Sequence, residues 1–299
     1  GGAKSVIFGD PHMPGDKKEQ YIRAFGHCIK DIRDYIPGPD MGTNEKCMAL
    51  IKDEGGRCAG MPADVGGIPL DEIGATALGV VCSTDVAKER VGLKVKGARV
   101  AVQGFGAVGK HAARFLDERG SLIVSAADIS GAVYDPDGLD IPALVEHVEG
   151  GGLICDFAGG KQIERDSIIG VDCDILIPAA RPDVIRKDNQ AEVKAKLIVP
   201  GANIGVTEEA EKLLHERGVL CIPDFIANAG GVICAAVEFA GGRKRDAVAT
   251  IEEKVAGNTE EMLRRMDDKG VLPREAAVAM ARERVDAAMR YTRFDGDWH

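Results

Sequence analysis

The sequence lacks the patterns that mark membrane, secreted and metal-binding proteins. No apolar run approaches the length needed to span a bilayer, and the N-terminal residues do not form a secretory signal. The eight cysteines include no CxxC pair, and the six histidines include no HxxxH or HExxH group. We therefore expect reduced thiols that pack as small apolar side chains, no bound metal ion, and a cytoplasmic protein that does not bind membranes.

The sequence has fewer basic than acidic residues, 38 Lys and Arg against 48 Asp and Glu, so its formal net charge is -10. Such a surface repels nucleic acid and anionic lipid, so neither is an expected partner. The 299 residues are 45% hydrophobic and 29% charged, a composition typical of a globular protein with room for two domains. The sequence contains no internal repeat and no low-complexity segment.

The most informative segment is glycine-rich and lies between a strand-like run and a helix-like run. It follows the apolar run at 99–102 and precedes 110–119, where apolar side chains recur on one face until Gly120. This order is typical of the turn that binds a dinucleotide pyrophosphate at a helix N-terminus. An ordinary glycine-rich turn in an α/β domain is the alternative. The candidate cofactor residues here are Gly104, Phe105, Gly106, Ala107, Val108 and Gly109.

Each glycine of this motif has its own predicted role. Gly104 allows a tight turn, Gly106 leaves room for the pyrophosphate, and Gly109 lets the helix pack closely on the strand. Free backbone amides and the positive end of the helix dipole then face the phosphates.

A second strand is predicted over 122–127 and ends at Asp128. An acid there can accept hydrogen bonds from the adenosine ribose hydroxyls and would repel a 2′-phosphate, which favours NAD over NADP. Ser130, two residues later, could face a phosphate, so NADP is the alternative.

Three further apolar runs, at 173–178, 196–199 and 219–222, continue the alternation of strands and helices. The helix between the last two is marked by Thr207 as its N-cap and by Gly218 as its end. This pattern predicts an α/β fold with a doubly wound parallel sheet, a Rossmann-type dinucleotide-binding domain. Ligands in such folds bind beyond the carboxyl ends of the strands, so the loops after these runs should line the cofactor cleft.

The N-terminal segment has a different pattern. It contains a predicted strand at 5–8, predicted helices at 17–35 and 45–53, and a Gly/Pro-rich passage at 55–69. We expect residues 1–75 to form part of a second domain.

The C-terminal segment, 244–293, is rich in Ala, Glu and Arg with helical periodicity and an interruption near Pro273. We expect two or more helices there. The expected dinucleotide-binding domain covers 76–271, and the last helices, about 272–299, are expected to pack back onto the first domain.

Short motifs spread along the chain are more specific together than any one of them alone. They are Gly1-Gly2-Ala3-Lys4, Gly9-Asp10-Pro11, Pro39-Asp40, Gly104-Phe105-Gly106, Ile177-Pro178-Ala179-Ala180, Gly201-Ala202-Asn203 and the run from Ala227 to Val232. In this order, and over essentially the whole chain, they resemble the glutamate/leucine/phenylalanine/valine dehydrogenases. The resemblance implies reversible NAD(P)-dependent oxidative deamination of an L-α-amino acid to the 2-oxo acid and ammonia.

The resemblance also implies which residues carry the proton chemistry. Lys4 matches the family's catalytic lysine, which activates the water that attacks the iminium, and a lysine buried beside other cations is partly neutral. Asp40 matches the acidic partner that exchanges a proton with the substrate amino group. Without the motif match, a solvated lysine and a Pro-Asp turn would be the simpler interpretations.

Further contacts follow from the same resemblance. Thr76 is similar to the threonine that contacts the nicotinamide carboxamide, and Ala179 and Ala180 line the neighbouring strand end. Asn203 resembles the residue near the nicotinamide ribose, and Asn228 resembles the asparagine that positions the substrate beside the cofactor. A helix cap or a turn is the alternative role for both asparagines.

The substrate is either glutamate or an aliphatic amino acid such as leucine or valine. Val232 and Ala235 are the candidate contacts to its side chain. The family's glutamate enzymes have a serine at the position of Ala235, and a methyl group cannot bind a carboxylate. In contrast, the sequences of 37–40 and 66–75 resemble the family's glutamate enzymes more than its aliphatic ones, which favours glutamate as the substrate.

The family has a further segment before its Gly-Gly-Ala-Lys motif, with lysines that bind the α-carboxylate and help choose the side chain. This sequence lacks that segment, so we expect a truncated or partial form without the front part of a substrate-binding and oligomerisation domain. The expected function is an NAD-linked L-amino-acid dehydrogenase that forms a homo-oligomer. The alternatives are a non-catalytic NAD-binding module, a fragment of such an enzyme, or another Rossmann oxidoreductase.

Overall fold

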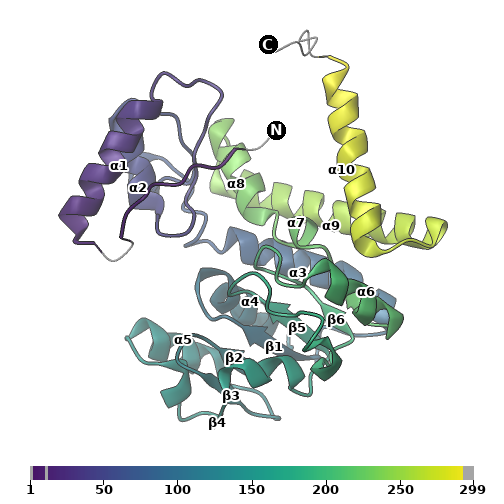
Figure 1. The fold of residues 1–299 in the computed structure, drawn as a ribbon. Coiled ribbons are helices and arrows are strands. Elements are labelled where there is room, and N and C mark those ends of the chain that lie inside the picture. Colours follow the sequence, from purple (N-terminus) through teal and green to yellow (C-terminus); the bar gives the residue numbers. More distant parts are fainter. Residues whose placement is uncertain (1–2, 11–12, 292–299) are drawn as a thin grey trace. The chain divides into compact units, whose positions relative to one another are not determined.

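The computed structural model describes residues 3–10 and 13–291 of the chain (Figure 1). The chain divides into two compact units. Residues 1–76 and 230–252 make up the first unit, and residues 77–229 and 253–299 make up the second.

The second unit contains a seven-stranded sheet in the order β4-β3-β2-β1-β5-β6-β7. β1, β2, β5, β6 and β7 are parallel, while β3 and β4 are antiparallel additions at one edge. The strands are β1 Arg99–Gln103, β2 Leu122–Ala127, β3 Ala132–Tyr134, β4 Lys161–Ile163, β5 Ile175–Pro178, β6 Leu197–Ile198 and β7 Leu220–Cys221. The helices of the chain are α1 Gly15–Ile29, α2 Glu45–Asp53, α3 Ala75–Ala87, α4 Ala107–Glu118, α5 Ile141–Glu149, α6 Glu208–Glu216, α7 Asp224–Ala227, α8 Gly230–Phe239, α9 Lys244–Lys269 and α10 Pro273–Met289.

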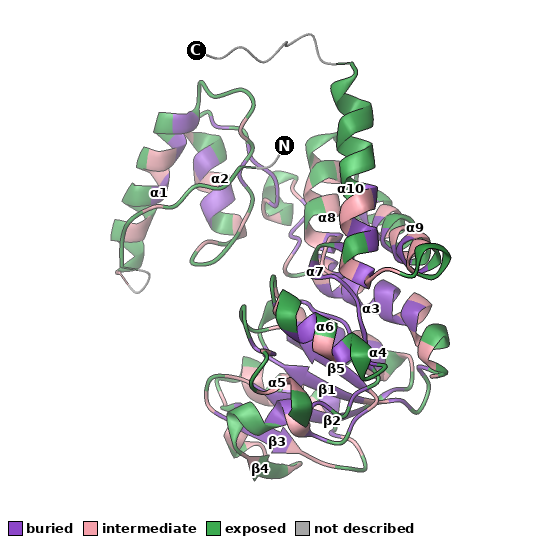
Figure 2. Cartoon of the chain, turned by 45° about the vertical axis from the view of Figure 1, so that its right-hand side comes forward, coloured by how far each residue is buried: buried purple, intermediate pink, exposed green. Residues whose placement is uncertain are grey.

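Side chains along the strands alternate between two apolar cores. Val100 and Val102 of β1 belong to one buried cluster, and Ala101 belongs to the other. Ile177 and Leu176 of β5 divide in the same way. Because successive side chains on a strand point to opposite faces, each face of this sheet has its own core, and the central strands β1 and β5 are buried on both sides (Figure 2). The predicted doubly wound α/β fold is thereby confirmed.

The first unit contains α1, α2 and α8, and α1 and α2 contribute Ile22, Met48 and Ile51 to a smaller core. α1 and α2 approach closely at Gly26, where an added Cβ would lie 3.0 Å from the Cα of Ile51. The predicted helix at 45–53 is confirmed as α2, with Asn44 as its N-cap.

The predicted strand at Ser5–Phe8 is wrong, because these residues have no regular secondary structure. Val6 and Phe8 are exposed, and no segment of the described part of this unit forms a strand that could pair with them. An extended segment without a partner leaves its backbone groups to water and is not a strand.

The division into units differs from the expected one at two places. Residues 230–252 group with the first unit, and α10 groups with the second. α10 does so because Ala276, Ala277 and Met280 are buried in the larger core beside Met262 of α9.

The thiols are free and most of them are buried. Burial raises the pKa of Cys58 and of Cys234 to about 11, so both stay protonated and pack as small apolar groups. Within the described residues, no helix is long and apolar enough to cross a membrane.

Leu116 of α4 tests the packing of the sheet against its helices. Its side chain is 0% exposed, so Leu116→Ala should lower the free energy of unfolding by about 3 kcal/mol through lost burial and the cavity left behind. The matched control is Leu122→Ala, at a site that is 39% exposed, where a loss of less than about 1 kcal/mol is expected. Urea denaturation of both variants measures the difference, and equal losses would contradict the assignment of α4 to the core.

Candidate active site

The glycine-rich segment forms a tight turn from β1 into α4. Gly104 has φ 99°, a left-handed conformation that favours glycine, and its N–H donates to the carbonyl of Ala127 at 2.8 Å. An added Cβ at Gly104 would lie 2.6 Å from the backbone nitrogen of Ala180, in the loop after β5. The turn therefore lies directly against the end of the neighbouring strand.

The other two glycines differ in their surroundings. An added Cβ at Gly109 would lie 1.7 Å from the carbonyl oxygen of Gly104 and 3.1 Å from Val102 Cγ1, so only glycine lets α4 pack this close to β1. An added Cβ at Gly106 would meet nothing within 4 Å. The space beside Gly106, where the pyrophosphate is predicted to bind, is thus open. The space beside Gly109 is filled by the Gly104 carbonyl of the turn.

The loops after β1, β5 and β6 meet at one edge of the sheet. The N–H of Ala179 donates to the carbonyl of Gln103 at 2.6 Å, and the N–H of Gly201 donates to the carbonyl of Pro178 at 2.8 Å. An added Cβ at Gly201 would lie 2.7 Å from Val108 Cγ1. β1 pairs with β2 on one side and β5 on the other, and this reversal of strand order is where doubly wound sheets bind ligands.

Asn203 and Asn228 come together at this edge. The Nδ2 of Asn228 donates to Asn203 Oδ1 at 2.6 Å and to the carbonyl of Gly201 at 3.3 Å. Asn228 also follows α7 as its C-cap residue, but its side chain points to the other loop rather than capping its own helix. The two asparagines thus form one polar unit.

Asp128 follows β2, as predicted, and is held by its neighbour. Its Oδ1 accepts from the backbone N–H of Ser130 at 2.7 Å and from the Ser130 hydroxyl at 2.5 Å. Both bonds use the same carboxylate oxygen, which leaves Oδ2 able to accept from a ligand hydroxyl.

The one aromatic side chain of the glycine-rich motif, that of Phe105, faces the core instead of solvent. The Phe105 side chain is buried in the larger core, and Ala107 and Val108 begin α4. Any contact of Phe105 with a ligand at this turn is therefore through its backbone.

Lys4 and Asp40 are in contact in the first unit, where Lys4 Nζ donates to Asp40 Oδ2. Asp40 is fixed by a turn in which Thr43 Oγ1 accepts from the Asp40 N–H at 2.9 Å and Asp40 Oδ1 accepts from the Met41 N–H at 2.8 Å. The side chains of Lys4 and Asp40 are 77% and 53% exposed, so their pairing adds little to stability. Gly1, Gly2 and Pro11, which contribute to the motifs around Lys4, lie outside the described residues.

The remaining predicted residues lie in α3 and α8: Thr76 is in the first turn of α3, and Val232 and Ala235 are in α8. An added Cβ at Gly231 would lie 2.7 Å from Thr76 Oγ1, so the threonine hydroxyl is beside the N-terminal turn of α8. Val232 is exposed, and Ala235 follows it three residues later, on the same helix face.

Glu238 has a structural role that the sequence prediction missed. Its carboxylate accepts from the backbone N–H groups of Gly60, Met61 and Ile68 at 3.0, 3.3 and 2.8 Å. It ties the Gly/Pro-rich loop to α8. The signal in the sequence is that Glu238 is the one charged residue of α8, an acid in an otherwise apolar helix.

A buried ion-pair cluster was also missed. The Nε and Nη2 of Arg274 donate to Glu211 at 2.7 and 2.6 Å, and Nη2 also donates to Asp224 at 2.8 Å. Glu211 and Asp224 are only 8% and 6% exposed, and the hydrogen bonds to Glu211 raise the pKa of Arg274. These residues are far apart in sequence, so no local pattern joins them.

Comparison with known proteins identifies the family of this chain. The model of the Glutamate/Leucine/Phenylalanine/Valine dehydrogenase family matches residues 66–293. The chain belongs to this family. It is 36% identical to the NADP-specific glutamate dehydrogenase of Saccharolobus shibatae over 85% of this chain and 63% of that protein. It is 35% identical to the glutamate dehydrogenase of Aeropyrum pernix over 97% of this chain and 75% of that protein. The chain thus spans about two thirds to three quarters of the length of these relatives.

Solved structures of the family have the same fold. Hetero-hexameric glutamate dehydrogenase from Thermus thermophilus, in its Leu-bound form, matches with a TM-score of 0.86 at 28% identity, over 96% of this chain and 72% of that chain. Glutamate dehydrogenase from Peptoniphilus asaccharolyticus matches with a TM-score of 0.75 at 27% identity, over 94% of this chain and 72% of that chain.

Membership of a dehydrogenase family implies a nicotinamide cofactor, and the residues at the glycine-rich turn fit its pyrophosphate. Within the described residues, no side chain caps the start of α4, so the first N–H groups of this helix are available to phosphate oxygens. The open space at Gly106 lies at that same helix start. No group of His, Cys, Asp and Glu side chains that could hold a metal ion occurs in the part of the chain that the structure describes.

Gly109→Ala and Gly106→Ala should have different effects on stability, because Gly109 is tightly packed and Gly106 faces open space. Gly109→Ala should lower the free energy of unfolding by about 2–3 kcal/mol, because its Cβ collides with the Gly104 carbonyl. Gly106→Ala should change it by no more than about 1 kcal/mol, the usual effect of such a change at a helix N-cap. Thermal unfolding of both variants tests this difference, and a stable Gly109→Ala protein would refute the close approach.

Proposed function

We propose that this protein catalyses the reversible, nicotinamide-dependent oxidative deamination of an L-α-amino acid to the 2-oxo acid and ammonia. The observation that carries the proposal is the meeting of Gly104, Ala180 and Gly201 at the end of the central strands, in a chain of this family. The bound nicotinamide would accept a hydride from the substrate α-carbon. The second unit would supply the cofactor site and the first unit the substrate groups.

Lys4 and Asp40 would move the protons. Asp40 would take a proton from the substrate ammonium, and Lys4 would activate the water that attacks the iminium carbon. Support for a joint role comes from the contact between the two side chains and from the turn that fixes Asp40. A lysine and an acid in direct contact can pass a proton between them without waiting for solvent.

Two observations bear on the amino acid. Ala235 offers a methyl group, which favours an aliphatic side chain over a carboxylate. The relatives are named glutamate dehydrogenases, which favours glutamate. We propose that Val232 and Ala235, on one face of α8, would contact the substrate side chain. Thr76 and Asn203 would contact the nicotinamide half of the cofactor, and Asn228 would bind both substrate and cofactor.

We propose NAD as the preferred cofactor, although one relative is named NADP-specific. Asp128 would accept from the ribose hydroxyls through Oδ2. The hollow beside Ser130 is lined by Glu164 and Arg165, and Arg165 forms a two-point pair with Asp166 at 2.7 and 3.1 Å. A guanidinium already paired in this way is a weak partner for a 2′-phosphate.

Assembly is a further part of the proposal. The Thermus thermophilus protein is described as hetero-hexameric, and we propose that this chain also forms an oligomer, with copies of itself. Size-exclusion chromatography with light scattering measures its mass directly.

The activity is tested by following NADH formation from NAD with L-glutamate, L-leucine, L-valine and L-phenylalanine, beside an NADH-binding assay on the same preparation. Turnover with one amino acid supports the proposal and names the substrate. Binding of NADH without turnover of any of them would instead favour a non-catalytic or incomplete form, which the partial coverage of the relatives allows.

Lys4→Ala and Asp40→Asn should each lower kcat by at least about a hundredfold, because each removes a proton-transfer group. NADH affinity should stay unchanged, since neither residue is in the unit with the glycine-rich turn. The matched controls are Lys30→Ala and Asp31→Asn, exposed residues of the same unit, which should keep full activity. Steady-state kinetics with the amino acid identified by the panel measure kcat, and retained turnover in either test variant would refute the assigned role.

Asp128→Ala should raise the Kd of NADH about tenfold or more, because a hydrogen bond to a charged group contributes about 1.5–3 kcal/mol. The Kd of NADPH should stay the same or fall, since the negative charge near the 2′-phosphate is gone. Asp137→Ala, at an exposed position of the same unit, is the control. Fluorescence titration gives both constants, and an unchanged Kd for NADH would contradict the ribose contact.

A further inference from the structure

The buried cluster around Arg274 reaches the loop after β6 through a single carboxylate. Asp224 Oδ1 accepts from Arg274 Nη2 at 2.8 Å, and Asp224 Oδ2 accepts from the backbone N–H of Ile204 at 2.7 Å. One oxygen of Asp224 is therefore fixed by the arginine and the other holds the loop.

The loop that Asp224 holds is strained. Ile204 has φ 53°, in the left-handed region that a β-branched side chain rarely adopts. Asp183, which also has a positive φ of 56°, donates its N–H to the Ile204 carbonyl at 2.8 Å. The Ile204 peptide is thus clamped at both its N–H and its carbonyl, and such strain persists only where the surroundings over-determine it.

The clamped residue adjoins the polar unit of the candidate site. Asn203 precedes Ile204 and accepts from Asn228 Nδ2 at 2.6 Å. Asn228 is the C-cap residue of α7, the helix that begins with Asp224, and its backbone N–H donates to the Asp224 carbonyl at 2.8 Å. Asp224 is therefore connected to Asn203 through the loop and to Asn228 through its own helix.

We propose that Arg274, acting through Asp224, is a positioning residue for the cofactor site, where it fixes Asn203 and Asn228 in their binding arrangement. The inference rests on the proposed function, in which these asparagines contact the nicotinamide end of the cofactor. Arg274 itself does not contact the ligand.

The geometry favours positioning over simple stabilisation. The fork of Arg274 binds both oxygens of Glu211 on α6, which fixes the plane of the guanidinium and hence the direction of its third bond to Asp224. A buried ion pair is on average no more stabilising than apolar packing, whereas its directionality fixes the groups that it joins. The position of α10, which carries Arg274, is thereby coupled to the loop after β6.

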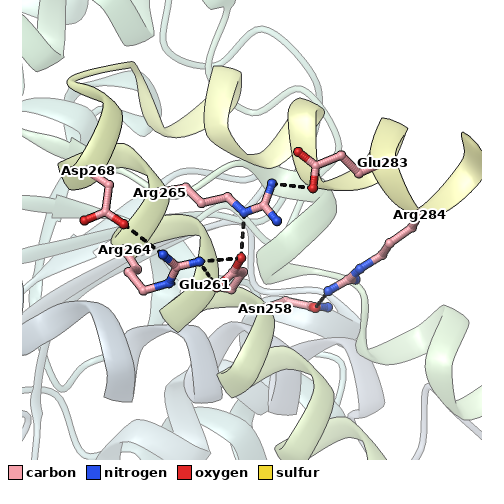
Figure 3. Close-up of polar contacts among 7 residues, drawn as sticks. All are labelled: Asn258, Glu261, Arg264, Arg265, Asp268, Glu283 and Arg284. Atoms are coloured by element: carbon pink, nitrogen blue, oxygen red, sulfur yellow. Dashed lines mark hydrogen bonds and ion pairs between the residues drawn. The ribbon is translucent and has the colours of Figure 1, made fainter. Parts of the chain in front are cut away.

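Arg265 provides a control in which the arginine side chain has a similar exposure, while its carboxylate partners are more exposed, at 30% and 57%, than those of Arg274, at 10% and 9%. Its side chain is 19% exposed, against 21% for Arg274, and it also pairs with two carboxylates, Glu261 at 2.6 Å and Glu283 at 2.7 Å (Figure 3). It links α9 to α10, whereas Arg274 links α10 to α6 and α7. Among the hydrogen bonds of the described residues, those of Glu261 and Glu283 go to arginines of α9 and not to the loop after β6.

The experiment compares Arg274→Met and Asp224→Ala with Arg265→Met in the full chain. Each is measured by NADH fluorescence titration, by hydrogen exchange of the Ile204 amide, and by thermal unfolding. We expect both test variants to raise the Kd of NADH about tenfold and to speed exchange at Ile204, while Arg265→Met stays within about twofold of the parent chain. Asp224→Ala leaves the Arg274–Glu211 pair intact, so it serves if Arg274→Met, which leaves two buried carboxylates without their cation, does not fold.

The outcomes separate this inference from the proposed function. If the parent chain binds NADH and the test variants bind it equally well, or if Arg265→Met weakens binding as much as they do, the positioning role is overturned. If the parent chain does not bind NADH, the proposed cofactor site fails, and exchange at Ile204 alone decides whether Arg274 and Asp224 fix the loop. Faster exchange in both test variants then supports the link, and unchanged exchange refutes it.

Discussion

The contact between the Gly104 carbonyl and Gly109 is the constraint on which the candidate cofactor site depends. A Cβ at Gly109 would overlap that oxygen, so α4 can begin directly at the end of β1 only because a glycine lies there. The same closeness explains the small residues opposite, Ala180 and Gly201, because larger side chains would push the loops after β5 and β6 away from the turn. The start of α4 with its uncapped N–H groups follows from this packing.

In the first unit, hydrogen bonds of a single carboxylate hold the Gly/Pro-rich loop in place. The Glu238 carboxylate gathers three backbone N–H groups, including that of Gly60, and Gly60 approaches Pro39 so closely that a Cβ would lie 2.6 Å from Pro39 Cδ. Asp40 is the next residue. The position of this exposed acid is therefore set by a chain of contacts that leads to α8, the helix that also carries Ala235.

The sequence predicted the parts whose signals are local. The glycine spacing, the strand that ends at Asp128 and the cap at Thr207 each depend on neighbours in the chain, and the structure contains the strand and the cap as predicted. The strand at Ser5–Phe8 failed because pairing needs a distant partner that apolar residues alone do not guarantee. The Arg274 cluster escaped prediction for the same reason, since its members are brought together only by the fold.

The strained loop at Ile204 offers a reason why Glu211, Asp224 and Arg274 are charged although they lie in the interior of the second unit. Two carboxylates and one arginine are costly to bury, and apolar packing would hold α10 at no greater cost in stability. Apolar side chains, however, could not accept a hydrogen bond from the Ile204 N–H. This N–H would then lose its carboxylate partner, in a residue that is already in an unfavourable backbone conformation. The Ile204 N–H in this left-handed turn is thus satisfied by a buried acid, that acid is paired with the Arg274 cation, and the fork of Arg274 on Glu211 keeps the cation in place.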